Sequence, residues 1–205
     1  VNSMKAIWTK PAKDITKEEH AEFYRHVARD WNDPLEAIRF SAEGAALSYE
    51  ALLYLPEIST TSMFTPERRG GVQFYVNRVL ISDDCQELTP DWLRFVRGVV
   101  DCPTVSLNIS RESMQHDRSI RQIRERIEAK VLDTLKKMME GEREKYLKFW
   151  KTFGKVVKEG LYSDQKTKDN IRDLILFESS ATKAGEACAV ADYLARMKPG
   201  QEKIF

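Results

Sequence analysis

Residues 110–139 have the sequence SRESMQHDRSIRQIRERIEAKVLDTLKKMM. Apolar side chains recur in this segment at steps of three and four positions, at Ile120, Ile123, Ile127, Val131, Leu135 and Met138. Such spacing puts them on one stripe of an α-helix and leaves the charged residues on the opposite face. We therefore predict one long amphipathic helix here, the spine of a first domain.

Strands are predicted on the amino-terminal side of this helix. Residues 47–55 and 72–81 are rich in aromatic and branched side chains, and a loop with proline and glycine separates them. We expect these two segments to be neighbouring strands of one sheet. A helix at residues 90–98 and a short strand at residues 105–109 should follow.

An earlier helix is predicted to begin at a capping box. Thr16 is followed three residues later by Glu19, and apolar residues then recur every four positions up to Trp31. Trp31 lies at the end of this helix, just before the Asp33-Pro34 pair. Of the four tryptophans, it is the one we most expect to be exposed.

The carboxy-terminal part is predicted to be mainly helical. One helix is expected from the spacing of Tyr146, Trp150, Phe153 and Val157, ending at Gly160, and another over residues 166–177. Residues 179–186 are small and polar, which predicts a loop before a smaller module. The alternation of strands and helices favours an α/β sandwich followed by a helical connector.

Composition narrows the classes of protein that remain. Hydrophobic residues make up 42% of the chain and charged residues 32%, a balance typical of globular proteins. The 33 basic and 32 acidic residues nearly cancel, so we expect neither nonspecific nucleic-acid binding nor an anionic membrane surface as partner. No apolar run approaches the roughly 20 residues that span a bilayer, and no secretory signal is recognisable.

The three cysteines favour a reducing compartment. Cys85, Cys102 and Cys188 are odd in number and widely spaced, so neither a disulfide framework nor a thiolate zinc site is indicated. Residues ahead of Met4 look like an added leader, and residues 203–205 look like the start of a strand. We expect both ends to be cut from a longer chain.

No self-contained active site is evident in the sequence. The three histidines, His20, His26 and His116, are not spaced as metal ligands, and no Walker, GxGxxG or GxSxG motif occurs. Asp83-Asp84 is better explained as a solvated turn than as a metal pair, because no third carboxylate is placed beside it. We therefore predict no metal site.

The start of the long helix is the exception. If Ser110 caps the helix, Arg111 lies in its first turn, where a cation opposes the positive end of the helix dipole. Free backbone N–H groups with an arginine suit a phosphate, and Gln115 lies one turn on, on the same face. The alternative is that Arg111 forms a surface ion pair with Glu112 or Asp117.

Around Arg111 the chain has the residues Leu107-Asn108-Ile109-Ser110-Arg111-Glu112. This segment resembles the LN(I/L/V)SRE signature of the heat-shock protein 90 middle domain. Other segments resemble that family in the same order along the chain: Phe23-Tyr24, Asp30-Trp31-Asn32-Asp33-Pro34, Tyr75-Val76-Asn77-Arg78-Val79-Leu80-Ile81, Trp92-Leu93-Arg94-Phe95-Val96-Arg97-Gly98-Val99-Val100-Asp101 and Arg196-Met197-Lys198. Segments such as Ser62-Met63-Phe64 are more similar to the mitochondrial and bacterial members than to the eukaryotic cytosolic ones.

The resemblance implies an architecture and a set of roles. It implies a large α/β/α segment at residues 1–140, a connector of short helices at 141–178 and the truncated start of a small α/β segment at 179–205. ATP and Mg²⁺ are expected in a separate N-terminal domain of the same chain. Arg111 is then the catalytic arginine that contacts the γ-phosphate, Gln115 assists it, and Asn108 with Ser110 supports the catalytic loop. Trp31 corresponds to a surface for client proteins.

Two functions therefore remain in view. In the first, the chain is the middle segment of an ATP-dependent chaperone with client proteins and co-chaperones as partners; the fragment alone is then an inactive monomer and its parent a homodimer. In the second, it is a non-catalytic protein-docking module whose Arg111 is a surface residue. The mitochondrial matrix or the cytoplasm is the expected location, and secretion is not.

Overall fold

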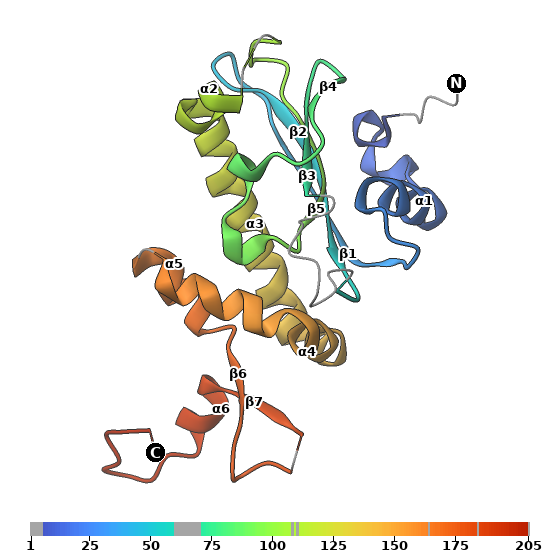
Figure 1. Ribbon diagram of the computed structural model, residues 1–205. Coiled ribbons are helices and arrows are strands. Elements are labelled where there is room, and N and C mark those ends of the chain that lie inside the picture. Colours follow the sequence, from blue (N-terminus) through green and yellow to red (C-terminus); the bar gives the residue numbers. More distant parts are fainter. Residues whose placement is uncertain are drawn as a thin grey trace, which may run out of the picture. The chain divides into compact units, whose positions relative to one another are not determined.

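A computed structural model describes residues 6–59, 71–107, 109, 111–163, 165–183 and 185–204. The chain divides into two compact units, Val1–Val131 and Leu132–Phe205, and the boundary falls inside helix α3. Helices and strands occur in both units (Figure 1), which confirms the predicted α/β class. The domain limits proposed from the sequence, at 140 and 178, stay predictions.

The first unit contains a five-stranded mixed sheet. Its strands have the order β1-β2-β5-β3-β4, and all neighbours are antiparallel except β3 and β5, which are parallel. The bounds are β1 Pro34–Ala42, β2 Tyr49–Pro56, β3 Val72–Val76, β4 Val79–Ser82 and β5 Arg97–Asp101. The helices are α1 Lys17–Ala28, α2 Arg111–His116 and α3 Arg118–Gly141, and short 3-10 turns occupy Ile7–Thr9, Ala12–Asp14, Gln86–Leu88 and Asp91–Leu93.

Both faces of the two central strands are covered. Every residue of β5, and every residue of β2 except Glu50, is buried. Leu52 and Val99 belong to the cluster that packs with α1, whereas Leu53 and Val100 point to the opposite face and are equally inaccessible. Figure 1 shows α1 on one side of the sheet and α2 with the start of α3 on the other. The predicted sandwich is therefore present.

Close packing of β2 against β5 requires a glycine. Gly98 lies opposite Leu53 and has φ +132°, a conformation that other residues rarely adopt. A Cβ at this position would lie 2.2 Å from the carbonyl oxygen of Leu52 and 2.8 Å from the Cα of Leu53. The two strands can pair at this register only because position 98 carries no side chain.

The segments predicted as strands at residues 47–55 and 72–81 do contain strands, but their arrangement differs from the expectation. Segment 72–81 is not one strand: Asn77 and Arg78, with φ of 50° and 65°, form a tight turn between β3 and β4. Segments 47–55 and 72–81 are not direct neighbours, because β5 lies between β2 and β3. The sequence analysis also missed β1, whose pattern of partly buried residues lacks a clean alternation.

The segment between β4 and α2 was predicted wrongly in two places. Residues 90–98 do not form an α-helix; a 3-10 turn at Asp91–Leu93 leads directly into β5. Residues 105–107 and 109 contain no strand. The apolar residues of this stretch are buried in the core: Trp92, Leu93, Phe95 and Val105. Because buried residues are apolar in helices, strands and turns alike, their hydrophobicity alone did not indicate the secondary structure.

The prediction of a single long helix over residues 110–139 is wrong, because the structure contains two helices in this region. α2 ends at His116 and α3 begins at Arg118. The Asp117 carboxylate Oδ1 accepts hydrogen bonds from the backbone N–H groups of Ser119 (2.7 Å) and Ile120 (3.1 Å), as an N-cap does. The regular spacing of apolar residues could not reveal this break, because it depends on hydrogen bonds that the Asp117 side chain accepts.

The second unit consists of helices and a two-stranded sheet. Beyond the rest of α3 it contains α4 Arg143–Glu159, a 3-10 turn Gly160–Tyr162, α5 Gln165–Arg172, β6 Leu176–Glu178, β7 Ala187–Ala189 and α6 Val190–Ala195. The Tyr146 hydroxyl, fully buried, donates to the carbonyl oxygen of Leu174. The helix expected at residues 166–177 is shorter than predicted, because its last residues pair as β6 with β7. Among the described residues, no helix is long and apolar enough to cross a membrane.

Candidate functional site

The predicted catalytic loop coincides with α2 and the residues before it. Asn108 and Ser110 lie outside the described residues, and Arg111 is described only through its backbone, as the first residue of α2. Gln115 is exposed on the next turn of the same helix. Because α2 has only six residues, its dipole is short, and a phosphate site cannot be argued from the helix start alone.

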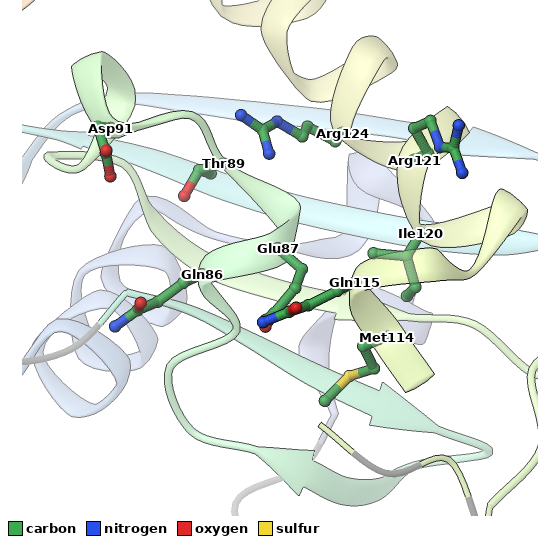
Figure 2. Close-up of a pocket in the computed structure, with 9 residues that line it drawn as sticks. All are labelled: Gln86, Glu87, Thr89, Asp91, Met114, Gln115, Ile120, Arg121 and Arg124. Carbon is green, nitrogen blue, oxygen red and sulfur yellow. The ribbon is translucent and has the colours of Figure 1, made fainter. Parts of the chain in front are cut away.

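A pocket of about 350 Å³ adjoins α2. Figure 2 shows its lining: Met114 and Gln115 from α2, three residues of α3, and the two 3-10 turns that follow β4 on the facing wall. The remaining lining residues are Gln86, Glu87, Thr89, Asp91, Ile120, Arg121 and Arg124. Gln115 thus reaches a defined cavity, although it was singled out from the sequence only by its spacing from Arg111.

The pocket carries charges of both signs. Glu87 and Asp91 contribute carboxylates from the 3-10 turns, and Arg121 and Arg124 contribute guanidinium groups from α3. The two negative and two positive charges balance, so the lining as a whole has no net charge that favours or excludes an anionic ligand.

Met114 attaches α2 to the body of the first unit. Its side chain is 3% exposed, and its sulfur lies 3.9 Å from Cys85 Sγ, which is also buried. Burial, the negative charge of Glu87 and a hydrogen bond to its carboxylate together raise the pKa of Cys85 to about 12. Among the described side chains of α2, at residues 112–116, Met114 is the buried one, and Ser113 beside it is exposed.

Trp31 is 91% exposed, as predicted from its position at a helix end. The residues around it are held firmly. Asp30 is 4% exposed; its Oδ2 accepts from the Tyr24 hydroxyl at 2.7 Å, and its Oδ1 accepts from the backbone N–H and side-chain amide of Asn32 at 3.0 and 2.7 Å. Burial acts to raise the pKa of Asp30, but these hydrogen bonds and the nearby Arg97 charge outweigh it and lower that pKa.

The histidines and acidic pairs form no metal cluster in the part of the chain that the structure describes. His20 Nδ1 is 2.9 Å from the Tyr54 hydroxyl, a hydrogen bond that gives it a structural partner. Asp83 lies 3.8 Å from Arg29 in an exposed ion pair. All three cysteines are free and buried.

Sequence reasoning missed several residues that shape these sites. The cap Asp117 could have been found, because an aspartate two residues ahead of Ser119 and three ahead of Ile120 is a common helix start. The contact between Tyr24 and Asp30 spans a helix end and has no local signal. Pocket residues Glu87 and Arg124 come from segments that only the fold brings together.

Known proteins are similar to this chain over its whole length. The family model for Hsp90 protein matches residues 1–205. The chaperone protein HtpG of Geobacter sulfurreducens is 49% identical over all 205 residues, and those of Streptomyces coelicolor and Mycobacterium avium are 47% and 45% identical over the same length. The chain spans about a third of these relatives, 31% of the first and 32% of the other two. All three are bacterial, which favours the bacterial branch over the mitochondrial one. With its whole length matched at this identity, the chain belongs to the Hsp90 family, of the bacterial HtpG type.

Proposed function

We propose that this chain is the middle segment of an ATP-dependent molecular chaperone. The observation that carries the proposal is the family match over the full chain, which includes the LNISRE segment at residues 107–112. The relatives are named chaperones, and the chain covers about a third of their length. ATP binding, client binding and the homodimeric state of the parent are therefore parts of the proposal, as is its action in the bacterial cytoplasm.

Within this proposal the chain completes an ATPase site. ATP with Mg²⁺, held by a separate N-terminal domain, would supply the phosphoryl group to be transferred. Arg111 would donate hydrogen bonds and positive charge to the γ-phosphate oxygens, as an arginine finger does, and the Gln115 amide would donate alongside it. Asn108 and Ser110 would hold the loop that carries Arg111.

Trp31 would provide a surface for client proteins or co-chaperones. Its nearly complete exposure supports this role, because a tryptophan side chain offers a large apolar area that a folded protein normally covers. The same exposure is what a non-catalytic docking module would show. Exposure of Trp31 therefore favours partner binding under either function. A measurement of catalysis is needed to distinguish the chaperone segment from the docking module.

The first experiment compares ATP turnover by the full-length protein and by the isolated 205-residue chain at equal concentration. The proposal predicts steady turnover by the full-length protein and none by the chain, with no measurable ATP binding to the chain in calorimetry. Tight binding with hydrolysis by the isolated chain would contradict the placement of the nucleotide in another domain.

A second experiment tests Gln115 against a matched neighbour. Gln115→Ala in the full-length protein should lower kcat while leaving ATP affinity nearly unchanged, because the amide acts on the transferring group. Gln86→Ala removes the same amide from the facing wall of the pocket and should have little effect. Equal effects of the two substitutions would indicate a general disturbance of the pocket.

A further inference from the structure

The backbone just before Trp31 is fixed by two side chains that are themselves buried, Tyr24 and Asp30. α1 ends at Ala28, and Arg29 turns the chain with φ 52° and ψ 40°. Asp30 then points inward to the Tyr24 hydroxyl, and Tyr24 is fully buried. Asp30 is 4% exposed and the next residue, Trp31, is 91% exposed, so the anchored chain places these two side chains in opposite environments.

On the other side of Trp31, hydrogen bonds from Asn32 complete the anchor formed by Tyr24 and Asp30. Asn32 donates two hydrogen bonds, from its backbone N–H and its side-chain amide, to the same Asp30 oxygen. Asp33 forms an ion pair of 2.6 Å with Arg25 of α1. Residues 30 and 32 are thus tied together. The Asp33–Arg25 pair is exposed, at 65% and 45% of the two side chains, so water screens it and the buried Asp30 provides the main attachment of this loop to α1.

This inference rests on the proposed role of Trp31 as a partner surface. We infer that Asp30 is a positioning residue that holds the Trp31 indole in an exposed, ready orientation for an apolar segment of a non-native polypeptide. A loop whose backbone is already held by the hydrogen bonds of Asp30 loses less conformational entropy on binding, so the partner binds more tightly than it would to a mobile loop. Tyr24 is buried, so it acts through Asp30 and does not itself contact the partner.

The test uses the full-length protein with two substitutions in the anchor. Tyr24→Phe removes one hydroxyl and keeps the ring that packs against Tyr54, and Asp30→Asn removes the charge with little change of shape. Asp33→Asn is the matched control, because it removes a carboxylate from the same loop without touching the Asp30 bonds. Thermal unfolding of each variant identifies any that fails to fold; Tyr24→Phe is the milder change.

Two readouts separate the positioning role from the partner role. The first is the fluorescence anisotropy decay of the Trp31 indole, obtained by subtracting the signal of the Trp31→Phe protein. The second is the affinity for reduced, carboxymethylated α-lactalbumin, a permanently unfolded polypeptide. Tyr24→Phe and Asp30→Asn should increase the amplitude of fast Trp31 motion and weaken binding roughly 3- to 10-fold, whereas Asp33→Asn should change neither.

Each of the following results tests a different part of the inference. Unchanged Trp31 motion in both anchor variants overturns the positioning role of Asp30, whatever the affinities. Faster motion with wild-type affinity, where Trp31→Ala does weaken binding, overturns the claim that ordering aids the partner. If Trp31→Ala itself leaves the affinity unchanged, the proposed partner surface fails, and the affinity part of the inference fails with it.

Discussion

Replacing Asp117 should destabilise the start of α3 and disturb α2. In the wild-type protein its Oδ1 accepts two backbone hydrogen bonds, at 2.7 and 3.1 Å, at the first turn of a 24-residue helix. Loss of an N-cap costs about 1 kcal/mol, and loss of a negative charge at the positive end of the helix dipole adds about 0.3–1 kcal/mol. Asp117→Ala should therefore lower the free energy of unfolding by about 1–2 kcal/mol, and Asp117→Asn by less, because asparagine also caps.

The assay is urea denaturation of the 205-residue chain, with amide hydrogen exchange at Ser119 and Ile120 to localise the effect. Asp133→Ala is the control: it removes an aspartate from the same helix that only pairs with Lys137 on the surface, which is worth about 0.5 kcal/mol at most. Alanine also favours helix at position 117, so α2 and α3 should tend to join. Equal losses for Asp117→Ala and Asp133→Ala, with unchanged exchange at the α3 start, would refute the reasoning.

Three further predictions concern the core. The pKa of His20 lies below 6.5, because burial and then the nearby Arg39 disfavour its charged form more than Glu19 favours it; unfolding free energy should therefore fall as the pH drops below about 6.5. His20→Gln should remove that part of the pH dependence, and an identical pH profile in both proteins would contradict the assignment. Gly98→Ala should cost about 3 kcal/mol or more in urea denaturation, since its Cβ would clash with β2. Gly141→Ala, at the last residue of α3 with open space around it, should be neutral or slightly stabilising, because alanine favours helix. Cys85, whose pKa burial raises to about 12, should react with iodoacetamide at pH 8 far more slowly in the folded chain than in urea, and comparable rates would show that it is not buried.

The sequence predicted the fold class better than it predicted the order of the strands in the sheet. Capping at Thr16 and Glu19 is local, and both reciprocal hydrogen bonds are present, at 3.2 and 3.1 Å. Strand order is not local: β5 enters between β2 and β3, and only the absence of a side chain at Gly98 lets it pair there. Nothing in the spacing of residues 97–101 distinguishes a central strand from the end of a helix.

Some features of the candidate site could likewise be predicted from the sequence, and others could not. The spacing of Arg111 and Gln115 identified one helix turn correctly, and the helix-end position of Trp31 predicted its exposure. The break at Asp117 and the anchor at Asp30 depend on side-chain hydrogen bonds that compete with regular structure. Hydrophobic periodicity carries no information about such bonds, so both were missed.

The most direct test of the account is the Arg111→Ala substitution in the full-length protein, with turnover and ATP affinity measured separately. Arg126→Ala, which removes the same charge from an exposed position of α3, is the control. If Arg111 contacts the transferring phosphoryl group, kcat should fall roughly 100-fold or more while ATP affinity changes little. Unchanged turnover, or a loss no greater than that of Arg126→Ala, would leave Arg111 a surface residue and the chain a docking module.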